Sequence, residues 1–272
     1  MEGKNHYKVA VLTICLNQNY WPYLGKMIES AKKFFLQGHE VDYFSWSDMP
    51  ENSLEGVKIF PTPPFEWPLP TLKRYHLFLR QEELLKEYDF LFYIDADMEF
   101  VSRVNGSEIL GEGLVAASHP MYHVSRQMVP PYEPNPESTA FIPRPGRIIE
   151  INGKKRFEPL YAAGGFQGGR SDSFIEAMKV MKKNEDEDFI NNRISIWNDE
   201  SHWNRFLFPA PLELLRDKTI WLSPSFVYPD SLNRAYYQRA VWGRNYVPKL
   251  VTLTKPFSLT KDGGVALNQI LR

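Results

Sequence analysis

An apolar segment, an amphipathic segment and a second apolar segment follow one another near the N-terminus, and this order restricts the fold more than any other feature. Residues 8–16 form a short run rich in β-branched side chains, which predicts a buried strand. Pro22 lies in the first turn of a predicted helix that we expect Gly38 to end in a left-handed conformation. Val41–Trp46 predicts a second strand. Because parallel strands joined by a helix require helices on both faces of the sheet, the sequence predicts an α/β domain.

The length and charge of the chain fit one such domain. Its 272 residues are enough to bury one substantial core, and 32 basic residues nearly balance 33 acidic ones. This balance excludes an intrinsically disordered chain and a strongly basic nucleic-acid binder. The apolar run Val9–Leu16 is about half of the roughly 20 residues that a membrane span needs, and the single cysteine, Cys15, cannot form an internal disulfide. We expect a cytoplasmic protein with no secretion signal, no integral membrane segment and no nucleic-acid partner.

Further elements are predicted along the chain. Leu72–Tyr88 predicts one charged amphipathic helix, and Phe90–Ile94 predicts an apolar strand. Six prolines between Met128 and Pro145 exclude a regular helix or a central strand and predict a long loop. Another helix is expected from near Ser171, and the charged run Lys182–Asp188 is expected to face water.

The C-terminal half contains a candidate helix cap and a basic segment. Ser173 and Glu176 form a candidate capping box at the start of the predicted helix near Ser171. The basic excess of the chain is concentrated in residues 231–272. This tail is either a solvated terminus or a segment that orders when it binds an anion.

Two carboxylates directly follow the predicted strand Phe90–Ile94. They are Asp95 and Asp97, separated by Ala96. In open α/β sheets, ligands bind outside the carboxyl ends of the strands. Carboxylates suit Mg²⁺ or Mn²⁺, which usually take few protein ligands and complete their coordination with substrate phosphates. The pair therefore predicts a metal-bound nucleotide diphosphate, and the alternative is a pair of loop carboxylates facing water.

Paired glycines occur in YAAGGFQGG, at residues 164–165 and 168–169. Glycine lets a ligand approach the backbone closely, but the spacing does not match a phosphate-binding loop. A tight turn between two elements explains the pairs equally well.

A further acidic pair follows Trp197, where Asn198 or Asp199 could cap a helix with Glu200 in its first turn. The helix dipole favours acids there, which explains them without any function. The functional interpretation is that Glu200 faces a developing sugar cation, as carboxylates do in glycoside chemistry. His119 and His202 do not have the spacing of a zinc motif.

Six segments, taken in order, carry a resemblance to one enzyme family. They are DFLFYIDADMEF, His119-Pro120, YEPNPESTAFIP, YAAGGFQGG, IWNDESHWNRFLF and LSPSF. Over most of residues 10–257 the chain resembles the ABO blood-group family of retaining α1,3-glycosyltransferases, which includes α1,3-galactosyltransferases and Forssman synthase. The resemblance implies a GT-A fold, in which a Rossmann-like nucleotide-binding half merges with an acceptor-binding half around one mixed sheet. We expect one catalytic domain over 1–272, with the nucleotide-sugar half over about 1–100, the acceptor and catalytic half over about 101–230, and a basic closing tail over 231–272.

The same resemblance implies roles at the donor site. Asp95 and Asp97 would hold Mn²⁺ (or Mg²⁺) and, through it, the diphosphate of a UDP-sugar, with the metal acting as a Lewis acid on the leaving group. Arg74 would contact the donor, and Lys255 in TLTKP would close over the diphosphate. Further donor contacts implied by the resemblance are Cys15, Asn17 and Tyr20 at the nucleotide, Ala96 within the acidic motif, Asp199 at the donor sugar, and Ala163, Gly164 and Gly165 beside it.

Glu200 is implied as the catalytic glutamate beneath the anomeric carbon of the donor. Whether it forms a covalent adduct or stabilises an oxocarbenium-like ion during same-face attack stays open. His119 and Trp197 would position the acceptor galactose, with Trp197 covering its apolar face.

The small residues Ala163, Gly164 and Gly165 lead us to expect UDP-GalNAc as donor, with UDP-galactose as the alternative. Gln167, which replaces an aromatic or small residue of relatives, leaves pocket size open to control from elsewhere. The expected acceptor is a β-galactoside, in particular fucosyl-α1,2-galactose, which would give a blood-group-A-like glycan. The competing hypotheses are a non-catalytic sugar- or nucleotide-binding module on the same fold, a nucleotidyltransferase and a nucleotide-sugar hydrolase.

Overall fold

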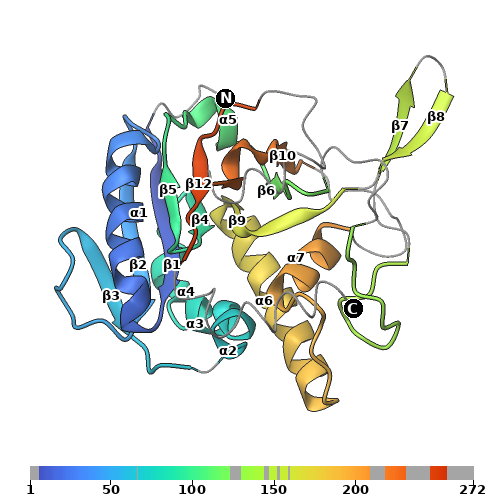
Figure 1. Ribbon diagram of the computed structural model, residues 1–272, viewed down its shortest axis with the longest axis horizontal. Coiled ribbons are helices and arrows are strands. Elements are labelled where there is room, and N and C mark those ends of the chain that lie inside the picture. The colour runs from blue at the N-terminus through green and yellow to red at the C-terminus, as the bar shows by residue number, and fades with distance from the viewer. Residues whose placement is uncertain are drawn as a thin grey trace.

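A mixed sheet of seven strands, in the order β10-β6-β9-β4-β1-β2-β3, forms the centre of the molecule (Figure 1). The computed structural model describes residues 6–65, 67–122, 130–143, 147–151, 154–158, 160–208, 218–230 and 246–255. The strands of the sheet are β1 (Lys8–Cys15), β2 (Glu40–Ser47), β3 (Val57–Pro61), β4 (Phe90–Ile94), β6 (Leu114–Ser118), β9 (Ala162–Arg170) and β10 (Ile220–Leu222). β4, β1, β2 and β3 pair in parallel, whereas β9 runs antiparallel to both β4 and β6. This mixed sheet confirms the predicted α/β class.

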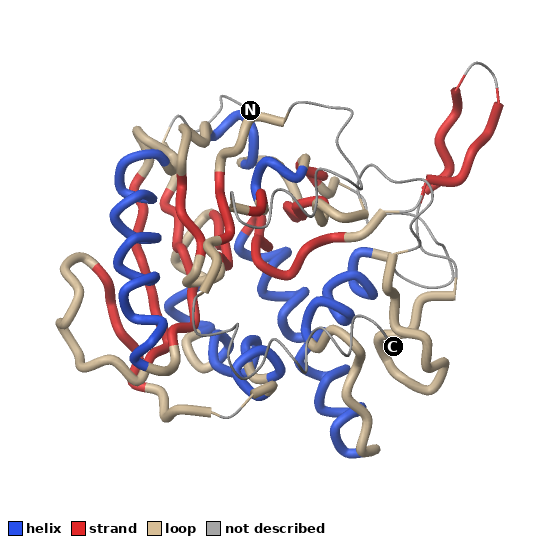
Figure 2. The backbone as a smooth tube through the Cα atoms, in the orientation of Figure 1, coloured by secondary structure: helices blue, strands red, loops and turns tan. Residues whose placement is uncertain are grey.

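The remaining elements surround this sheet. The helices are α1 (Trp21–Phe34), α2 (Leu69–Leu72), α3 (Arg74–Leu79), α4 (Glu82–Leu85), α5 (Gly106–Ile109), α6 (Ser171–Ile190) and α7 (Asp199–Leu207), with 3₁₀ turns at Gln18–Tyr20 and Pro224–Phe226. A small sheet joins β11 (Tyr228–Pro229), β12 (Leu250–Thr252) and β5 (Met98–Phe100). β7 (Arg147–Ile151) and β8 (Lys154–Glu158) form a ribbon that projects from the main body (Figure 2).

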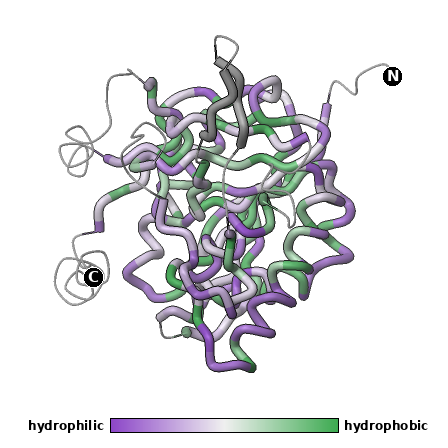
Figure 3. The backbone as a smooth tube through the Cα atoms, turned by 90° about the vertical axis from the view of Figure 1, so that its right-hand side faces the viewer, coloured by the Kyte–Doolittle hydropathy of each residue, from purple (hydrophilic) through white to green (hydrophobic). Residues whose placement is uncertain are grey.

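The main sheet is buried on both faces, which explains the continuous apolar run of β1. Val9 and Val11 belong to a core that includes the buried face of α1, whereas Ala10 and Leu12 belong to a second core that includes α3, α6 and α7. All four side chains are fully buried. Figure 3 shows the resulting distribution, with hydrophobic residues gathered toward the centre and the outer helices alternating between hydrophobic and hydrophilic residues. Helices therefore cover both faces, as the strand-helix-strand pattern predicts.

The N-terminal unit follows the prediction with one correction. β1 and β2 pair in parallel and α1 connects them, with Pro22 in its first turn. The helix, however, ends at Phe34, and Leu36 is the first residue beyond it with a positive φ, of 48°. Gly38, with φ 92°, lies in the following turn rather than at the helix end. The burial of Phe35 and Leu36 against the core stabilises this earlier end.

The segment predicted as one helix over Leu72–Tyr88 instead contains the last residue of α2, followed by the separate short helices α3 and α4. Breaks fall at Lys73, with φ −102° and ψ 6°, and at Gln81, with φ −112° and ψ 25°. The prediction of a strand over Phe90–Ile94 is confirmed. Residues 130–143 contain neither helix nor strand, in agreement with the predicted loop, and the other residues of that loop, 128–129 and 144–145, lie outside the described part.

α6 begins at Ser171 as predicted, but the capping box is wrong. Ser173 lies inside the helix, where its N–H donates to the Asp172 side chain at 2.7 Å. The expectation that Lys182–Asp188 faces water is also wrong in part, because Glu185 and Asp188 are buried. Asp188 accepts hydrogen bonds from the proline-rich segment that crosses α6, from Ser138 Oγ at 2.6 Å and the Thr139 N–H at 2.9 Å.

The two glycine pairs of YAAGGFQGG lie within β9 and not in a turn between elements, so the turn interpretation is wrong. A Cβ at Gly168 would collide with the carbonyl oxygen of Leu91 on β4, and one at Gly169 with that of Gly113. These two glycines therefore let β9 pack closely between its neighbours. Among the described residues, no helix is both long and apolar enough to cross a membrane.

Candidate active site

The carboxyl ends of two parallel strands bring the first candidate residues to one edge of the sheet. β1 ends at Cys15 and β4 ends at Ile94, so residues 15–17 and Asp95–Asp97 emerge on the same side. The N–H of Asp95 donates to the carbonyl oxygen of Gly165 at 3.0 Å, which ties the acidic motif to β9. This edge is where ligands bind in open α/β sheets.

Each aspartate of the motif has a cationic partner. Asp95 Oδ1 lies 3.5 Å from Arg74 Nη2 and also accepts a hydrogen bond from the Tyr93 hydroxyl. Asp97 is buried, and its Oδ2 lies 2.5 Å from Lys255 Nζ. Burial raises the pKa of the Asp97 carboxyl, and the nearby ammonium opposes that rise. Both carboxylates therefore lie in a site where they attract cationic groups.

The carboxylate oxygens of Asp95 and Asp97 suit a divalent metal ion whose remaining ligands are phosphate oxygens and water. Within the described ranges, no group of three or more His, Cys, Asp or Glu residues could hold a metal. Asp95 and Asp97 supply hard carboxylate oxygens, and Mg²⁺ or Mn²⁺ commonly binds one or two of these together with phosphate oxygens and water. The pair fits such an ion, and Lys255 already provides a positive charge beside Asp97.

Lys255 reaches the site through the small sheet. β12 pairs antiparallel with β5, and the N–H of Leu253 donates to the carbonyl oxygen of Asp97 at 2.8 Å. Lys255 Nζ lies 5.1 Å from the ring centroid of Tyr20, which follows β1. The structure thus brings together Tyr20, Asp97 and Lys255, although 77 or more residues separate each from the next. The rest of the predicted tail, 231–245 and 256–272, lies outside the described residues.

Arg74 joins the acidic motif to α7. Its guanidinium bonds Asp199 at the start of α7, donates to the Gly164 carbonyl oxygen at 3.2 Å, and lies 3.8 Å from the Tyr93 ring centroid. Arg74 and Asp199 are both buried. Burial raises the pKa of Asp199 to about 6, even though Arg74 lowers it. A buried pair of this kind is stable only while both partners are present.

Glu200 projects from the first turn of α7 toward β9. Its Oε2 accepts a hydrogen bond from the Gly164 N–H at 2.6 Å. Burial raises the pKa of Glu200 to about 7, and the Gly164 N–H and the nearby Tyr161 hydroxyl lower it. The Tyr161 hydroxyl lies close to the carboxylate without forming a hydrogen bond of normal geometry. Near neutral pH, Glu200 can therefore exist as a carboxylate or as a carboxylic acid.

α7 is positioned by its N-terminus and by one amide. Asn198 occupies one of the two predicted N-cap positions with φ 51° and ψ −127°, outside the left-handed helical region that asparagine commonly adopts, and its side chain makes no capping bond. Asn204 accepts from the Ala162 N–H at 2.8 Å and donates to the Ala162 carbonyl oxygen at 2.9 Å. This pair of bonds fixes α7 on β9 and thereby sets where Asp199 and Glu200 point.

Ala163, Gly164 and Gly165 line the same edge and are buried. A Cβ at Gly164 would lie 3.2 Å from Glu200 Cβ and Oε2. A Cβ at Gly165 would lie 2.6 Å from Met98 Cε and 2.8 Å from Asp95 Oδ2. A side chain at either position would therefore displace a neighbouring side chain, Glu200 in the first case and Met98 or Asp95 in the second.

Of the two predicted acceptor residues, Trp197 contacts Glu200 and His119 contacts Tyr161. The Trp197 carbonyl oxygen accepts from the Glu200 N–H at 3.0 Å, and the His119 N–H donates to the Tyr161 carbonyl oxygen at 2.9 Å. His119 Nδ1 accepts from the Met121 N–H at 3.2 Å, and burial lowers the pKa of His119 to about 4. His119 is therefore neutral near pH 7, with its proton on Nε2.

Cys15 and Asn17, the predicted nucleotide-binding residues at the end of β1, have structural roles. Burial raises the pKa of the Cys15 thiol to about 12, so it is not a nucleophile near neutral pH. The N–H of Asn17 donates to both Asp48 side-chain oxygens, at 3.1 and 3.0 Å, and Asn17 has a positive φ of 81°. These bonds hold the exposed turn that leads to Tyr20.

Sequence reasoning missed several residues that shape the site. They are Tyr93, Tyr161, Asn204 and Tyr75. Tyr93 and Tyr161 are polar residues in otherwise apolar segments, and this signal could have found them, whereas Tyr75 and Asn204 lie among charged and polar residues and carry no such signal. Tyr75 and Asn204 are fully buried, and each hydrogen-bonds an atom of β9. Buried polar side chains of this kind are usually retained for the bonds they make.

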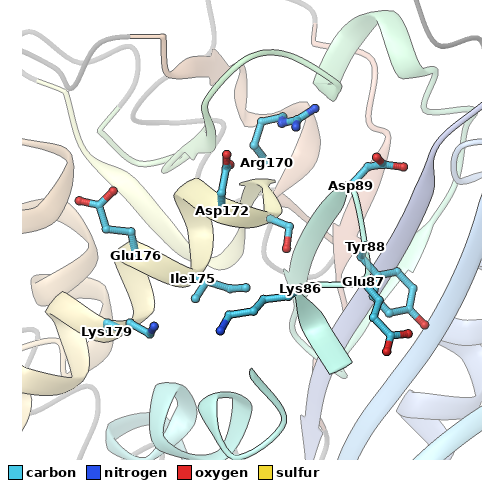
Figure 4. Close-up of a pocket in the computed structure, with 10 residues that line it drawn as sticks. Lys86, Glu87, Tyr88, Asp89, Arg170, Asp172, Ile175, Glu176 and Lys179 are labelled. Carbon is cyan, nitrogen blue, oxygen red and sulfur yellow. The ribbon is translucent and has the colours of Figure 1, made fainter. Parts of the chain in front are cut away.

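A cavity of about 660 Å³ lies elsewhere, at the opposite end of β4. Its lining includes Lys86, Asp89, Arg170 and Lys179, and it contains none of the candidate site residues (Figure 4). Lys86 and Lys179 both form ion pairs with Glu82, at 2.7 and 2.6 Å.

The fold and the site together define an α/β protein with cation-paired carboxylates and a half-buried glutamate at the carboxyl edge of its sheet. The model of glycosyltransferase family 6 matches residues 4–246, and the chain belongs to that family. This confirms the family and the fold expected from the six segments.

Curated relatives agree with this membership. The histo-blood group ABO system transferase 1 of Rattus norvegicus is 27% identical over 237 residues, which cover 83% of this chain and 64% of the relative. The globoside alpha-1,3-N-acetylgalactosaminyltransferase 1 of Gallus gallus is 29% identical over 216 residues, covering 74% and 58%. The O-antigen biosynthesis glycosyltransferase WbnI of Escherichia coli is 23% identical over 216 residues, covering 78% and 87%. The chain thus spans less than two thirds of the length of the first two relatives.

Proposed function

We propose that the chain is a retaining α1,3-glycosyltransferase that moves GalNAc from UDP-GalNAc to the 3-hydroxyl of a β-galactoside, in particular fucosyl-α1,2-galactose. The observation that carries the proposal is the position of Glu200 beside the Arg74–Asp199 pair and the Asp95–Asp97 motif. Family membership supports glycosyl transfer, and the name of the Gallus gallus relative supports the α1,3 linkage and the choice of GalNAc.

The reaction breaks the bond between the anomeric carbon and UDP and forms a bond from that carbon to the acceptor oxygen. Negative charge develops on the diphosphate, and Lys255 beside Asp97 is the cationic side chain suited to neutralise it. Mn²⁺ or Mg²⁺ held by Asp95 and Asp97 would supply Lewis-acid assistance to the same leaving group. The proton of the acceptor hydroxyl leaves with the departing UDP.

Positive charge develops at the anomeric carbon as the donor bond breaks. Glu200 is a carboxylate above its pKa of about 7, and in that form it stabilises this charge from a partly desolvated position. Arg74 holds Asp199 in place to contact the donor sugar. Neutral His119 offers an Nε2–H to an acceptor oxygen, and Trp197 offers an apolar face to the galactose ring.

In this proposal both halves of the chain contribute residues to the reaction. Residues of about 1–100 supply Tyr20, Arg74 and the acidic motif, and residues of about 101–230 supply His119, the β9 glycines and Glu200. Lys255 represents the closing tail.

The test is UDP release from purified protein with UDP-GalNAc and UDP-galactose in parallel. Each donor is assayed with and without fucosyl-α1,2-galactoside, and with Mn²⁺ or a chelator. We expect release from UDP-GalNAc that requires the acceptor and stops with the chelator. Release with UDP-galactose alone would overturn the donor assignment, and release that resists the chelator would overturn the metal assignment. Acceptor-independent release would indicate a hydrolase, and no release with either donor would favour a binding module.

A further inference from the structure

The backbone of Gly164 connects the groups that the proposed reaction uses. Its N–H donates to Glu200 Oε2 at 2.6 Å, and its carbonyl oxygen accepts from Arg74 Nη1 at 3.2 Å. The same carbonyl oxygen accepts a second hydrogen bond, from Gln167 Nε2 at 3.1 Å. The orientation of one residue's backbone therefore decides where the Glu200 carboxylate and the Arg74 guanidinium lie.

Gly164 lies outside the regular ladder of the sheet. β9 pairs with β4 over Phe166–Arg170, and with β6 through residues 167–169 and, after a register shift, through Ala162. Gly164 lies in the interval between these pairs, where the neighbouring strands do not set the direction of its N–H and carbonyl groups. A glycine in such a position has more conformational freedom than any other residue. Side-chain hydrogen bonds must supply the constraint.

Gln167 and Tyr75 supply that constraint from inside the core. Both side chains are fully buried, and the Tyr75 hydroxyl donates to Gln167 Oε1 at 2.8 Å. Because Oε1 is the acceptor for Tyr75, the amide nitrogen of Gln167 is turned toward Gly164. Burial raises the pKa of Tyr75 well above its ordinary value, so the hydroxyl keeps the proton that it donates. The chain of bonds runs from α3, through β9, to the Gly164 carbonyl oxygen.

We propose that Gln167, oriented by Tyr75, is a positioning residue that fixes the Gly164 peptide and so aims its N–H at the Glu200 carboxylate. This role rests on the proposed glycosyl transfer. Gln167 does not touch the donor in this account, because its side chain is fully buried and both of its polar ends are bonded within the protein. Its loss should affect the chemical step more than donor binding, since Arg74 keeps its second anchor at Asp199.

The variants are Gln167→Leu, which keeps a similar volume without the amide, Tyr75→Phe, and the two combined. The matched control is Tyr88→Phe, which removes a hydroxyl that donates to Asp42 Oδ2 at 2.7 Å, away from the site. We expect Gln167→Leu to lower kcat by about 10–100-fold, with the donor KM and the Kd for UDP within about 2-fold of wild type. Tyr75→Phe should lower kcat by about 3–10-fold, and the double variant should match Gln167→Leu alone, because Tyr75 acts through Gln167. Tyr88→Phe should leave kcat unchanged.

The outcomes separate this role from the proposed function. If the wild-type chain transfers no sugar, the proposed function fails and the role fails with it. If the wild type is active and Gln167→Leu keeps its kcat, or loses UDP affinity in parallel with kcat, the positioning role alone is overturned. If Gln167→Leu does not fold, Tyr75→Phe decides alone: a kcat equal to that of Tyr88→Phe overturns the role, and a selective fall in kcat supports it.

Discussion

Glu200→Gln should make the folded chain more stable while it stops the reaction. Burial raises the pKa of Glu200 from 4.5 to about 7, so the folded state holds the proton more tightly than the unfolded state. Between pH 4.5 and 7 this carboxyl therefore makes unfolding progressively easier as pH rises, and above pH 7 its full effect is present. At about 1.4 kcal/mol per pH unit, the upper limit is about 3 kcal/mol.

The expected gain is smaller than this limit, because the side chain is only partly shielded from water and the amide accepts a weaker bond from Gly164. We expect Glu200→Gln to raise the free energy of unfolding by about 1–2 kcal/mol at pH 8 and to leave it almost unchanged at pH 4.5. The measurement is denaturant unfolding of both proteins across this range. Glu29→Gln, at an exposed position of α1, is the control and should change stability by less than about 0.5 kcal/mol at every pH.

The same variant should lower kcat by about 100-fold or more, because a neutral amide does not stabilise positive charge at the anomeric carbon. In the wild type, kcat should rise with pH through about 7 as Glu200 ionises. If Glu200→Gln is less stable than the wild type at pH 8, the burial of an ionised Glu200 is not unfavourable and the reasoning is refuted.

Three further changes test other parts of the site. Arg74→Met leaves Asp199 buried without its cation and should lower the free energy of unfolding by about 3–5 kcal/mol; a loss below 1 kcal/mol in denaturant unfolding would contradict this. Gly165→Ala places a Cβ 2.8 Å from Asp95 Oδ2, so UDP-sugar binding measured by calorimetry should weaken, and unchanged affinity would show that Asp95 moves freely. Burial lowers the pKa of His202 from 6.5 to about 4, so the free energy of unfolding falls by up to about 3 kcal/mol as pH falls through this window. His202→Gln should lack this pH-dependent loss. If the free energies of unfolding of the variant and the wild type change in parallel with pH, this reasoning is refuted.

Much of the fold could be predicted from the sequence because its signals are local. The apolar runs of β1 and β4 alternate between two cores, and burial on both faces requires continuous hydrophobicity. Because Asp95 and Asp97 directly follow the apolar run of β4, the sequence alone also predicts that they lie at the carboxyl edge of the sheet. Predictions that rested on weaker signals are wrong. The single helix predicted over Leu72–Tyr88 is broken at Lys73 and Gln81, and the glycines that suggested a turn lie within β9.

The sequence by itself determined the α/β class, the acidic motif at a strand end and the family, because strand and helix periodicity and motif order are properties of neighbouring residues. Only the tertiary structure decided which groups meet. Lys255 reaches Asp97 through β12, Arg74 bonds Asp199, and Tyr75 orients Gln167, although 92 or more residues separate each pair in the chain. The raised pKa of Glu200 is likewise a property of the assembled site, since burial between α7 and β9 causes it. Long-range packing sets these charges and hydrogen bonds, and no local pattern in the sequence records them.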